Sequence, residues 1–326
     1  MALLEVKNLV KKFPISGGLF GKTLGHIHAV TDVSFQIEEG QVLGLVGESG
    51  SGKTTLARTL MRLYEPDAGE ILFDQKNWTS FSKRELQSHR KSIQMIFQDP
   101  YSSLNPRMKI GNIISESWKI HKSLPKKQMP EKVEELLTWV GLDPAAAHQY
   151  PHEFSGGQRQ RIGIARALSL LPKMLICDEP VSALDVSVQA QILNLLMDLK
   201  KKLKLTYLLI SHDLKVVHQV SDVVAIMYLG RLVEMLPASQ LLKSRHPYTQ
   251  ALLQAIPIPD PQRKLNPVPV QGEIPSPMHP PSGCVFHTRC AYAQEHCKRE
   301  IPVLRPLELS HTVACHLAEE IKPLSI

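Results

Sequence analysis

Short apolar runs separated by polar turns make up residues 1–46 of the chain. The runs ALLEVKNLV and VTDVSFQIEEG mix apolar and polar positions, and QVLGLVG is almost entirely apolar. Such runs predict β-strands, several of them at a sheet edge. The apolar spacing becomes helical over 53–63, and IQMIFQDP at 93–100 predicts another strand.

Two later runs are short, apolar and end in acidic or polar residues: KMLICDEP at 173–180 and TYLLISHD at 206–213. Buried parallel strands have this pattern, with functional residues at their carboxyl ends. Between them, VSVQAQILNLLMDLK predicts a crossover helix of about 15 residues. Because residues 99–170 are mostly helical in pattern, we expect an α/β core with a helical insert.

The composition changes after about residue 235. Prolines are dense over 256–282, which predicts an extended, semi-rigid strap over a surface. The chain has 326 residues, 43% of them hydrophobic, enough for one large core or for one core and a smaller module. We therefore divide it into a main domain, 1–255, with a helical subdomain at about 99–170, and an extension, 256–326.

The net charge of +7 and the sequence pI of about 9.1 fit nucleotides, nucleic acid or a cytoplasmic membrane surface as partners. The densest basic run, Lys200–Lys202, falls at the end of a predicted helix, where it favours the helix dipole. The first residues lack the apolar core of a signal peptide, and no run of 18 apolar residues occurs. We expect a cytosolic chain whose five cysteines form no structural disulfides.

A glycine-rich loop, GESGSGKT at 47–54, matches G-x-x-x-x-G-K-[ST] and lies between a predicted strand and a predicted helix. Glycines let backbone N–H groups turn onto phosphate oxygens, and the helix N-terminus adds positive charge. Lys53 is expected to reach the β- and γ-phosphates and Thr54 to bind Mg²⁺. The alternative is a flexible glycine turn. The predicted nucleotide contacts of this loop are Gly47, Ser49, Gly50, Ser51, Gly52, Lys53, Thr54 and Thr55.

The acidic pair Asp178–Glu179 ends the buried strand LICDEP. Asp178 is expected to hold Mg²⁺, usually through water, and Glu179 to act as general base for an attacking water. The alternative is a solvated acidic turn. Cys177, inside the apolar run, is expected to be a core thiol.

A second glycine-led helix start occurs in EFSGGQRQR at 153–161. Ser155 is a good N-cap, and Gly156–Gly157 allow the backbone to approach an anion. On spacing alone, a capped helix with a glycine lead-in is the favoured interpretation of this stretch.

The segment SGGQRQR resembles the signature of ABC-transporter ATPases. Gln98 before DP is similar to that family's Q-loop, SALD at 182–185 to its D-loop and His212 to its switch histidine. Phe13 lies where the family has an aromatic residue that stacks on adenine. The resemblance covers about residues 3–255. It implies a P-loop NTPase domain with a parallel-sheet core, an antiparallel β edge and a helical subdomain, here followed by a small Pro/Cys-rich extension.

The resemblance also implies a site shared by two chains. ATP with Mg²⁺ would lie between the phosphate loop of one domain and the signature of another, paired head to tail. On the family's terms, Glu179, His212 and Gln98 are catalytic, and Thr54, Gln98 and Asp178 hold Mg²⁺. The remaining nucleotide contacts implied are Phe13, Ser155, Gly156, Gly157, Gln158, Asp178 and Asp185.

The segments HPYTQALLQAIP, GEIPSP and SGCVFHTRCAYAQEHC resemble the extension of dipeptide/oligopeptide and nickel importer ATPases, as does QDPYSSLNPR at 98–107. This implies an ATP-hydrolysing subunit of a peptide importer. It would lie at the cytoplasmic side of the inner membrane, with a homologous ATPase (identical or related), two transmembrane permease subunits and, indirectly, a solute-binding protein as partners, and no nucleic acid.

Other functions stay open at this point. Nickel and antimicrobial-peptide uptake systems share these marks. A soluble, non-transport ABC ATPase is a different class, as is a paralogue that binds ATP without hydrolysing it.

Four of the five cysteines follow the proline-rich stretch, spaced C-x5-C-x6-C-x17-C. Soft thiolates in fours suit zinc or an iron–sulfur cluster, but the C-x2-C pairs of zinc ribbons are missing. The resembled extension implies a structural [4Fe–4S] cluster on Cys284, Cys290, Cys297 and Cys315. The alternative is four reduced, unliganded thiols. The histidines nearby are expected to be surface residues rather than ligands: His287, His296, His311 and His316.

Overall fold

The computed structural model describes residues 1–17, 22–256, 270 and 272–324. The chain divides into two compact units, which we describe separately. Unit 1 comprises Met1, Glu38–Val42 and Ser80–Ile210. Unit 2 comprises Ala2–Ile37, Leu43–Thr79 and Ser211–Ile326.

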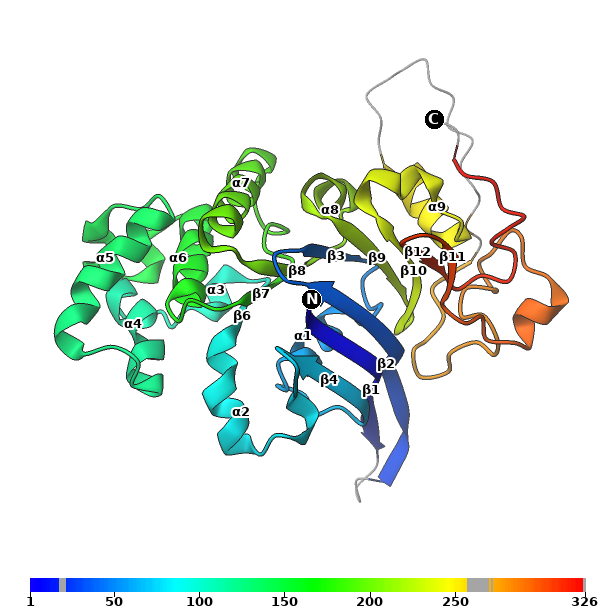
Figure 1. The fold of residues 1–326 in the computed structure, drawn as a ribbon, viewed down its shortest axis with the longest axis horizontal. Helices are drawn as coiled ribbons and strands as arrows, with labels where there is room; N and C mark the ends of the chain where they lie inside the picture. The colour runs from blue at the N-terminus through cyan, green and yellow to red at the C-terminus, as the bar shows by residue number, and fades with distance from the viewer. Residues whose placement is uncertain (18–21, 257–269, 271, 325–326) are drawn as a thin grey trace, which may run out of the picture. The chain divides into compact units, whose positions relative to one another are not determined.

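Unit 1 contains three parallel strands and most of the helices (Figure 1). The strands β6 (Ile93–Ile96), β7 (Met174–Asp178) and β8 (Thr206–Ser211) pair with Ile93 opposite Met174 and Met174 opposite Thr206. The strand β7 is buried at every position, as its continuous apolar run predicts. The helices are α2 (Lys83–His89), α3 (Pro100–Ser103), α4 (Ile110–His121), α5 (Met129–Trp139), α6 (Gly156–Leu168) and α7 (Val186–Leu203).

The helices α4, α5 and α6 pack together as the helical region that the sequence predicts (Figure 1). Their apolar residues recur at three- and four-residue spacing: Ile110, Ile113, Ile114 and Trp118 on α4 are buried. The Trp118 indole N–H donates to the Ser169 carbonyl oxygen at 2.6 Å, which satisfies this buried donor just beyond α6.

Unit 2 contains two sheets. In the first, β2 (Lys22–Glu38), β1 (Ala2–Gly17), β4 (Ala68–Phe73) and β5 (Lys76–Asn77) are neighbours in that order, and β4 runs antiparallel to both β1 and β5. In the second, the order is β11 (Arg305–Glu308), β12 (His311–Val313), β10 (Arg231–Pro237), β9 (Val223–Tyr228) and β3 (Val42–Val46). Only the β3–β9 pair among these is parallel. The helices of this unit are α1 (Lys53–Leu60), α8 (Leu214–Val220) and α9 (Pro247–Gln254).

The sequence did not predict that the extension adds strands to a sheet. The strand β12 pairs antiparallel with β10, with Val313 opposite Glu234. The extension therefore forms one compact unit with the phosphate-loop segment. Most of the proline-rich strap predicted over 256–282 lies outside the described residues, and the division at residue 255 stays a prediction.

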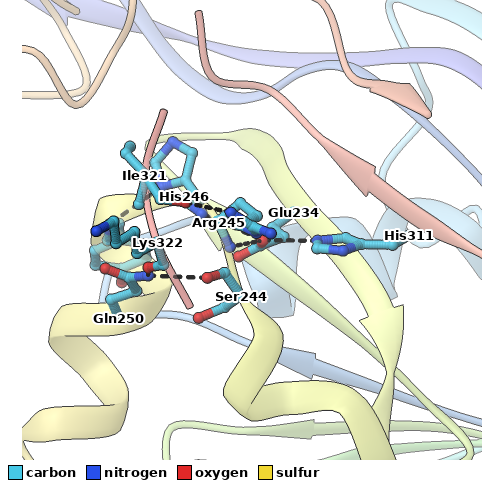
Figure 2. A network of polar contacts seen from close by, with 9 residues as sticks. Glu234, Ser244, Arg245, His246, Gln250, His311, Ile321 and Lys322 are labelled. Carbon is cyan, nitrogen blue, oxygen red and sulfur yellow. Dashed lines mark hydrogen bonds and ion pairs between the residues drawn. The ribbon is translucent and has the colours of Figure 1, made fainter. Parts of the chain in front are cut away.

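A buried polar network anchors the extension to the segment before it (Figure 2). Glu234 Oε1 lies 2.9 Å from His311 Nε2 and accepts the backbone N–H of Arg245 at 2.6 Å. The Gln250 amide donates to the carbonyl oxygens of Ser244 and Lys322 at 2.9 and 2.8 Å.

The placement of His311 corrects one prediction. His311 is 1% exposed, so the expectation of a surface histidine is wrong. Its partner Glu234 is 77 residues earlier in the chain, and this contact satisfies a polar ring that would otherwise be buried without a partner.

Among the residues that the structure describes, no helix is both long enough and apolar enough to cross a membrane.

Candidate functional site

The phosphate loop, residues 47–52, joins β3 to α1 and requires glycine at two positions. Gly52 has φ +105°, and a Cβ atom there would lie 2.1 Å from the Ala29 carbonyl oxygen. A Cβ atom at Gly47 would lie 2.2 Å from the Met227 carbonyl oxygen. Both contacts are with backbone, which cannot move aside cheaply, so only glycine fits this loop.

The lysine of this loop is enclosed by it. Lys53 is 5% exposed, and its Nζ donates to the carbonyl oxygens of Gly47 and Glu48 at 2.7 and 2.9 Å. The helix α1 begins at Gly52 without a side-chain cap. The backbone N–H groups at such a helix N-terminus are suited to binding an anion. Thr54 and Thr55 are partly buried, and Ser49 and Gly50 are exposed.

In unit 1, the end of β7 brings predicted catalytic residues into contact. The Gln98 side-chain amide donates to Glu179 Oε2 at 2.9 Å. Glu179 has φ +47°, a left-handed conformation that is costly for a non-glycine residue and is often found at functional sites. Asp178, one residue earlier, is 1% exposed. Burial, with the neighbouring Asp178 charge, raises the pKa of Cys177 to about 12, as expected for an unreactive core thiol.

The second glycine loop begins α6 with a capping box. The Ser155 hydroxyl accepts the Gln158 backbone N–H at 3.4 Å, and the Gln158 side chain accepts the Ser155 N–H at 3.0 Å. Ser155 and Gln158 are exposed, and Gly156 and Gly157 are partly exposed. The D-loop residue Asp185 is also exposed, at the start of α7.

Two further predicted residues lie in unit 2. Phe13 is partly exposed, and its ring packs edge-on against Tyr64 with 5.1 Å between centroids. His212 is exposed and directly follows β8. Their predicted roles, adenine stacking and γ-phosphate sensing, stay predictions.

The tail cysteines Cys284, Cys290, Cys297 and Cys315 line one small pocket of about 20 Å³, together with His287 and His316. Burial raises the pKa of Cys284 to about 11 and that of Cys315 to about 12, and the neighbouring thiols add to both shifts. Since thiolates this close repel one another, holding them deprotonated requires a positive centre, and four soft donors suit one. Within the described part of the chain, however, no three His, Cys, Asp or Glu side chains are arranged to hold a metal ion.

Comparisons with known proteins identify the family of the chain. The family model described as ABC transporter matches residues 30–182, and the model for the oligopeptide/dipeptide transporter C-terminal region matches residues 233–297. The oligopeptide transport ATP-binding protein AppF of Bacillus subtilis is 51% identical over 97% of this chain and 97% of its own length. The chain belongs to the ABC-transporter ATPase family.

Another relative of this ATPase is the di/tripeptide transport ATP-binding protein DppF of Pseudomonas aeruginosa, 48% identical over 98% of each chain. A solved structure, the dimeric post-hydrolysis state of the ATP-binding cassette MJ0796 bound to ADP and Pi, superposes with a TM-score of 0.64 at 25% identity. It covers 72% of this chain and 98% of its own. CbiO1 of Clostridium perfringens has a TM-score of 0.63 at 28% identity over 74% and 90% of the two chains.

These findings confirm the predicted family, the fold class and an ATP-hydrolysing transporter subunit. Three residues that the sequence pattern did not indicate meet at the phosphate loop: Glu48, Tyr248 and Arg289. Arg289 lies between two cysteines, and nothing in the sequence there indicates that it is buried. Glu48 occupies a variable position of the phosphate-loop motif, so the motif assigns it no role.

Proposed function

We propose that this ATPase couples the binding and hydrolysis of ATP to the import of di- and oligopeptides through separate permease subunits. The observation that carries the cargo class is the C-terminal region at 233–297, whose family model is described by oligopeptide/dipeptide transport. The relatives named for oligopeptide and di/tripeptide transport match over nearly the whole chain.

The roles of the residues follow from chemistry and position. Lys53 and the N–H groups of the phosphate loop bind the triphosphate. Thr54, Gln98 and Asp178 would hold Mg²⁺, which would neutralise charge on the phosphates. Glu179 accepts the proton of the attacking water, with Gln98 in contact at 2.9 Å to orient its carboxylate, and His212 contacts the γ-phosphate.

The second nucleotide-binding surface belongs to a partner chain. Five residues would form this surface, where a second ATPase can supply the triphosphate. Three of them are exposed and two partly exposed: Ser155, Gln158 and Asp185, and Gly156 and Gly157. Support comes from the similar cassette MJ0796, whose structure is described as dimeric with ADP and Pi. In the proposed assembly, two ATPases lie at the cytoplasmic face of the membrane and contact two transmembrane permease subunits, and a solute-binding protein takes part indirectly.

Glu179→Gln tests the catalytic assignment. We expect ATP binding to persist while hydrolysis falls about 10²–10³-fold, because the amide cannot accept the proton. Nucleotide binding, phosphate release and dimer formation by light scattering measure the three effects. Glu134→Gln, an exposed position on α5, is the matched control. Normal hydrolysis by Glu179→Gln contradicts the general-base role.

Co-purification from membranes tests the assembly. The tagged ATPase should bring down two multi-span permeases and an ATPase partner, and purified complexes in vesicles should accumulate labelled dipeptide when ATP is supplied. Nickel uptake without peptide uptake would contradict the proposed cargo.

We also propose that Cys284, Cys290, Cys297 and Cys315 hold a [4Fe–4S] cluster with a structural role. Support comes from the single pocket that the four thiols line. Anaerobic purification followed by iron, sulfide and zinc analysis tests this. About four iron and four sulfide per chain are expected, and one zinc without iron contradicts the cluster.

A further inference from the structure

A buried arginine of the extension holds the phosphate loop. The Arg289 guanidinium donates from Nη1 to Glu48 Oε2 at 2.7 Å and from Nη2 to Glu48 Oε1 at 3.2 Å. This is the two-point geometry that makes arginine–carboxylate pairs both strong and specific. Arg289 is only 8% exposed, so solvent screens this pair far less than it screens a surface salt bridge.

Glu48 is the second residue of the phosphate loop, and its backbone is held as well. Its N–H donates to the Tyr248 hydroxyl oxygen at 2.8 Å. Its carbonyl oxygen accepts Lys53 Nζ at 2.9 Å. Arg289, Tyr248 and Lys53 therefore fix three different groups of one residue, and one of the three is the expected phosphate ligand.

The other end of this contact is the cysteine pocket. Arg289 lies in the short loop between Cys284 and Cys290, both of which line the pocket. Phe286 of this loop is 2% exposed and packs against Tyr228 and Tyr248, with ring centroids 5.2 and 5.3 Å apart. Arg289 also reaches the Tyr228 hydroxyl at 3.4 Å. A movement of either cysteine must therefore displace the packed loop that carries the guanidinium.

We propose that Arg289 is a positioning residue for the phosphate loop, and that through the Arg289–Glu48 pair the cysteine pocket and the ATP site influence each other. This inference rests on the proposed role of Lys53 in binding ATP. With Arg289 withdrawn, the Glu48 carboxylate loses its counter-charge close to where a triphosphate binds. Repulsion between like charges then weakens ATP binding.

The first test separates positioning from general stability. Arg289→Ala should raise KM for ATP and the Kd for a fluorescent ATP analogue about tenfold, with a smaller change in kcat, since a charge-assisted hydrogen bond is the main loss. Arg289→Lys should recover part of the affinity. Adding Glu48→Gln to Arg289→Ala should also recover part, because it removes the unpaired charge. Arg305→Ala is the control: it breaks another arginine–glutamate pair of the extension, to Glu319 at 2.7 Å, on the surface.

The second test uses the reciprocity of coupled binding. The tail cysteines are labelled with a maleimide in protein shown by metal analysis to carry no cluster. If the pocket and the ATP site are coupled, ATP slows this labelling in the unaltered chain and in Arg305→Ala. The effect should be lost in Arg289→Ala. Cys177 is fully buried and does not obscure the labelling.

Each result has one meaning. If Arg289→Ala binds the analogue as tightly as the unaltered chain while its melting temperature falls, Arg289 only attaches the extension and the positioning role is refuted. An equal effect of ATP on labelling with and without Arg289 refutes the coupling. If the unaltered chain binds no ATP, the proposed function itself fails, and the two failures are thus distinguishable.

Discussion

The two glycine-led helix starts of this ATPase differ in how much room they leave for a side chain on the glycine. In the phosphate loop, a Cβ atom on Gly52 would collide with the chain's own backbone at 2.1 Å. At Gly156 in the signature, the nearest atom to a Cβ would be Leu184 Cδ2 at 3.4 Å, an ordinary contact. The fold of this chain therefore excludes a side chain at Gly52, whereas a Cβ atom at Gly156 would make only ordinary contacts.

The polar side chains of the two loops also differ in how far they are buried within the chain. Lys53 is buried and bonded to its own loop, which is therefore assembled before any ligand arrives. In the signature, Ser155 and Gln158 form the hydrogen bonds of the capping box, and both side chains stay exposed. The phosphate loop is thus held by hydrogen bonds within the chain, whereas the signature keeps exposed polar groups at the surface to which we propose a partner ATPase binds.

The largest effect should come from Gly52→Ala. The added methyl group meets the Ala29 carbonyl oxygen, and φ +105° is itself costly for alanine, so the loop must distort. ATP affinity should fall at least about 100-fold in a binding titration. Gly40→Ala is the control, because Gly40 has φ +76° but nothing within 4 Å. Equal losses in both variants would point to a general effect of alanine at positive φ and would contradict a specific collision in the phosphate loop.

A smaller but more selective effect is expected from Gly156→Asp. A carboxylate in the first turn of α6 favours the helix dipole by about 0.3–1 kcal/mol, so stability should hold. Hydrolysis should fall about 100-fold, since the carboxylate replaces a backbone surface meant for phosphate. The ATP affinity of the dilute chain should not change, because its own phosphate loop is intact.

Gly156→Asn, with the same shape and no charge, is the control for this variant. Normal ATP hydrolysis by the Gly156→Asp chain would contradict the proposed role of the signature in binding the triphosphate.

The smallest effect concerns Gly163 in the middle of α6. A Cβ atom there meets nothing within 4 Å, so alanine should stabilise the helix by about 0.5–1 kcal/mol. The melting temperature should rise slightly and hydrolysis should not change. A loss of activity in Gly163→Ala would contradict the expectation that a methyl group fits at this buried position without disturbing α6.

The sequence predicted those parts of the molecule that depend on local pattern. The runs ending at Asp178 and Ser211 are strands because continuous apolar residues favour burial on both faces. Cys177 is a core thiol for the same reason. The phosphate loop and the capping box were predictable because their chemistry lies within a few consecutive residues.

The missed features depend on contacts between distant residues. The strand β12 is three residues long and exists because β10 accepts it, so HTV carries little signal of its own. His311 reads as a surface histidine until Glu234 is placed beside it. The role of Arg289 depends on its contact with Glu48, which is 241 residues away in the chain.

The pairing of β12 with β10 also covers an edge of β10 that would otherwise be open to another strand. The outermost strand, β11, contains Pro306, which has no N–H to offer, and the charged residues Arg305 and Glu308. Natural proteins use such residues to prevent foreign strands from docking. A chain truncated before Arg305 would expose the unpaired N–H and C=O groups of β10 and should aggregate, so the tail guards solubility as well as carrying the cysteines.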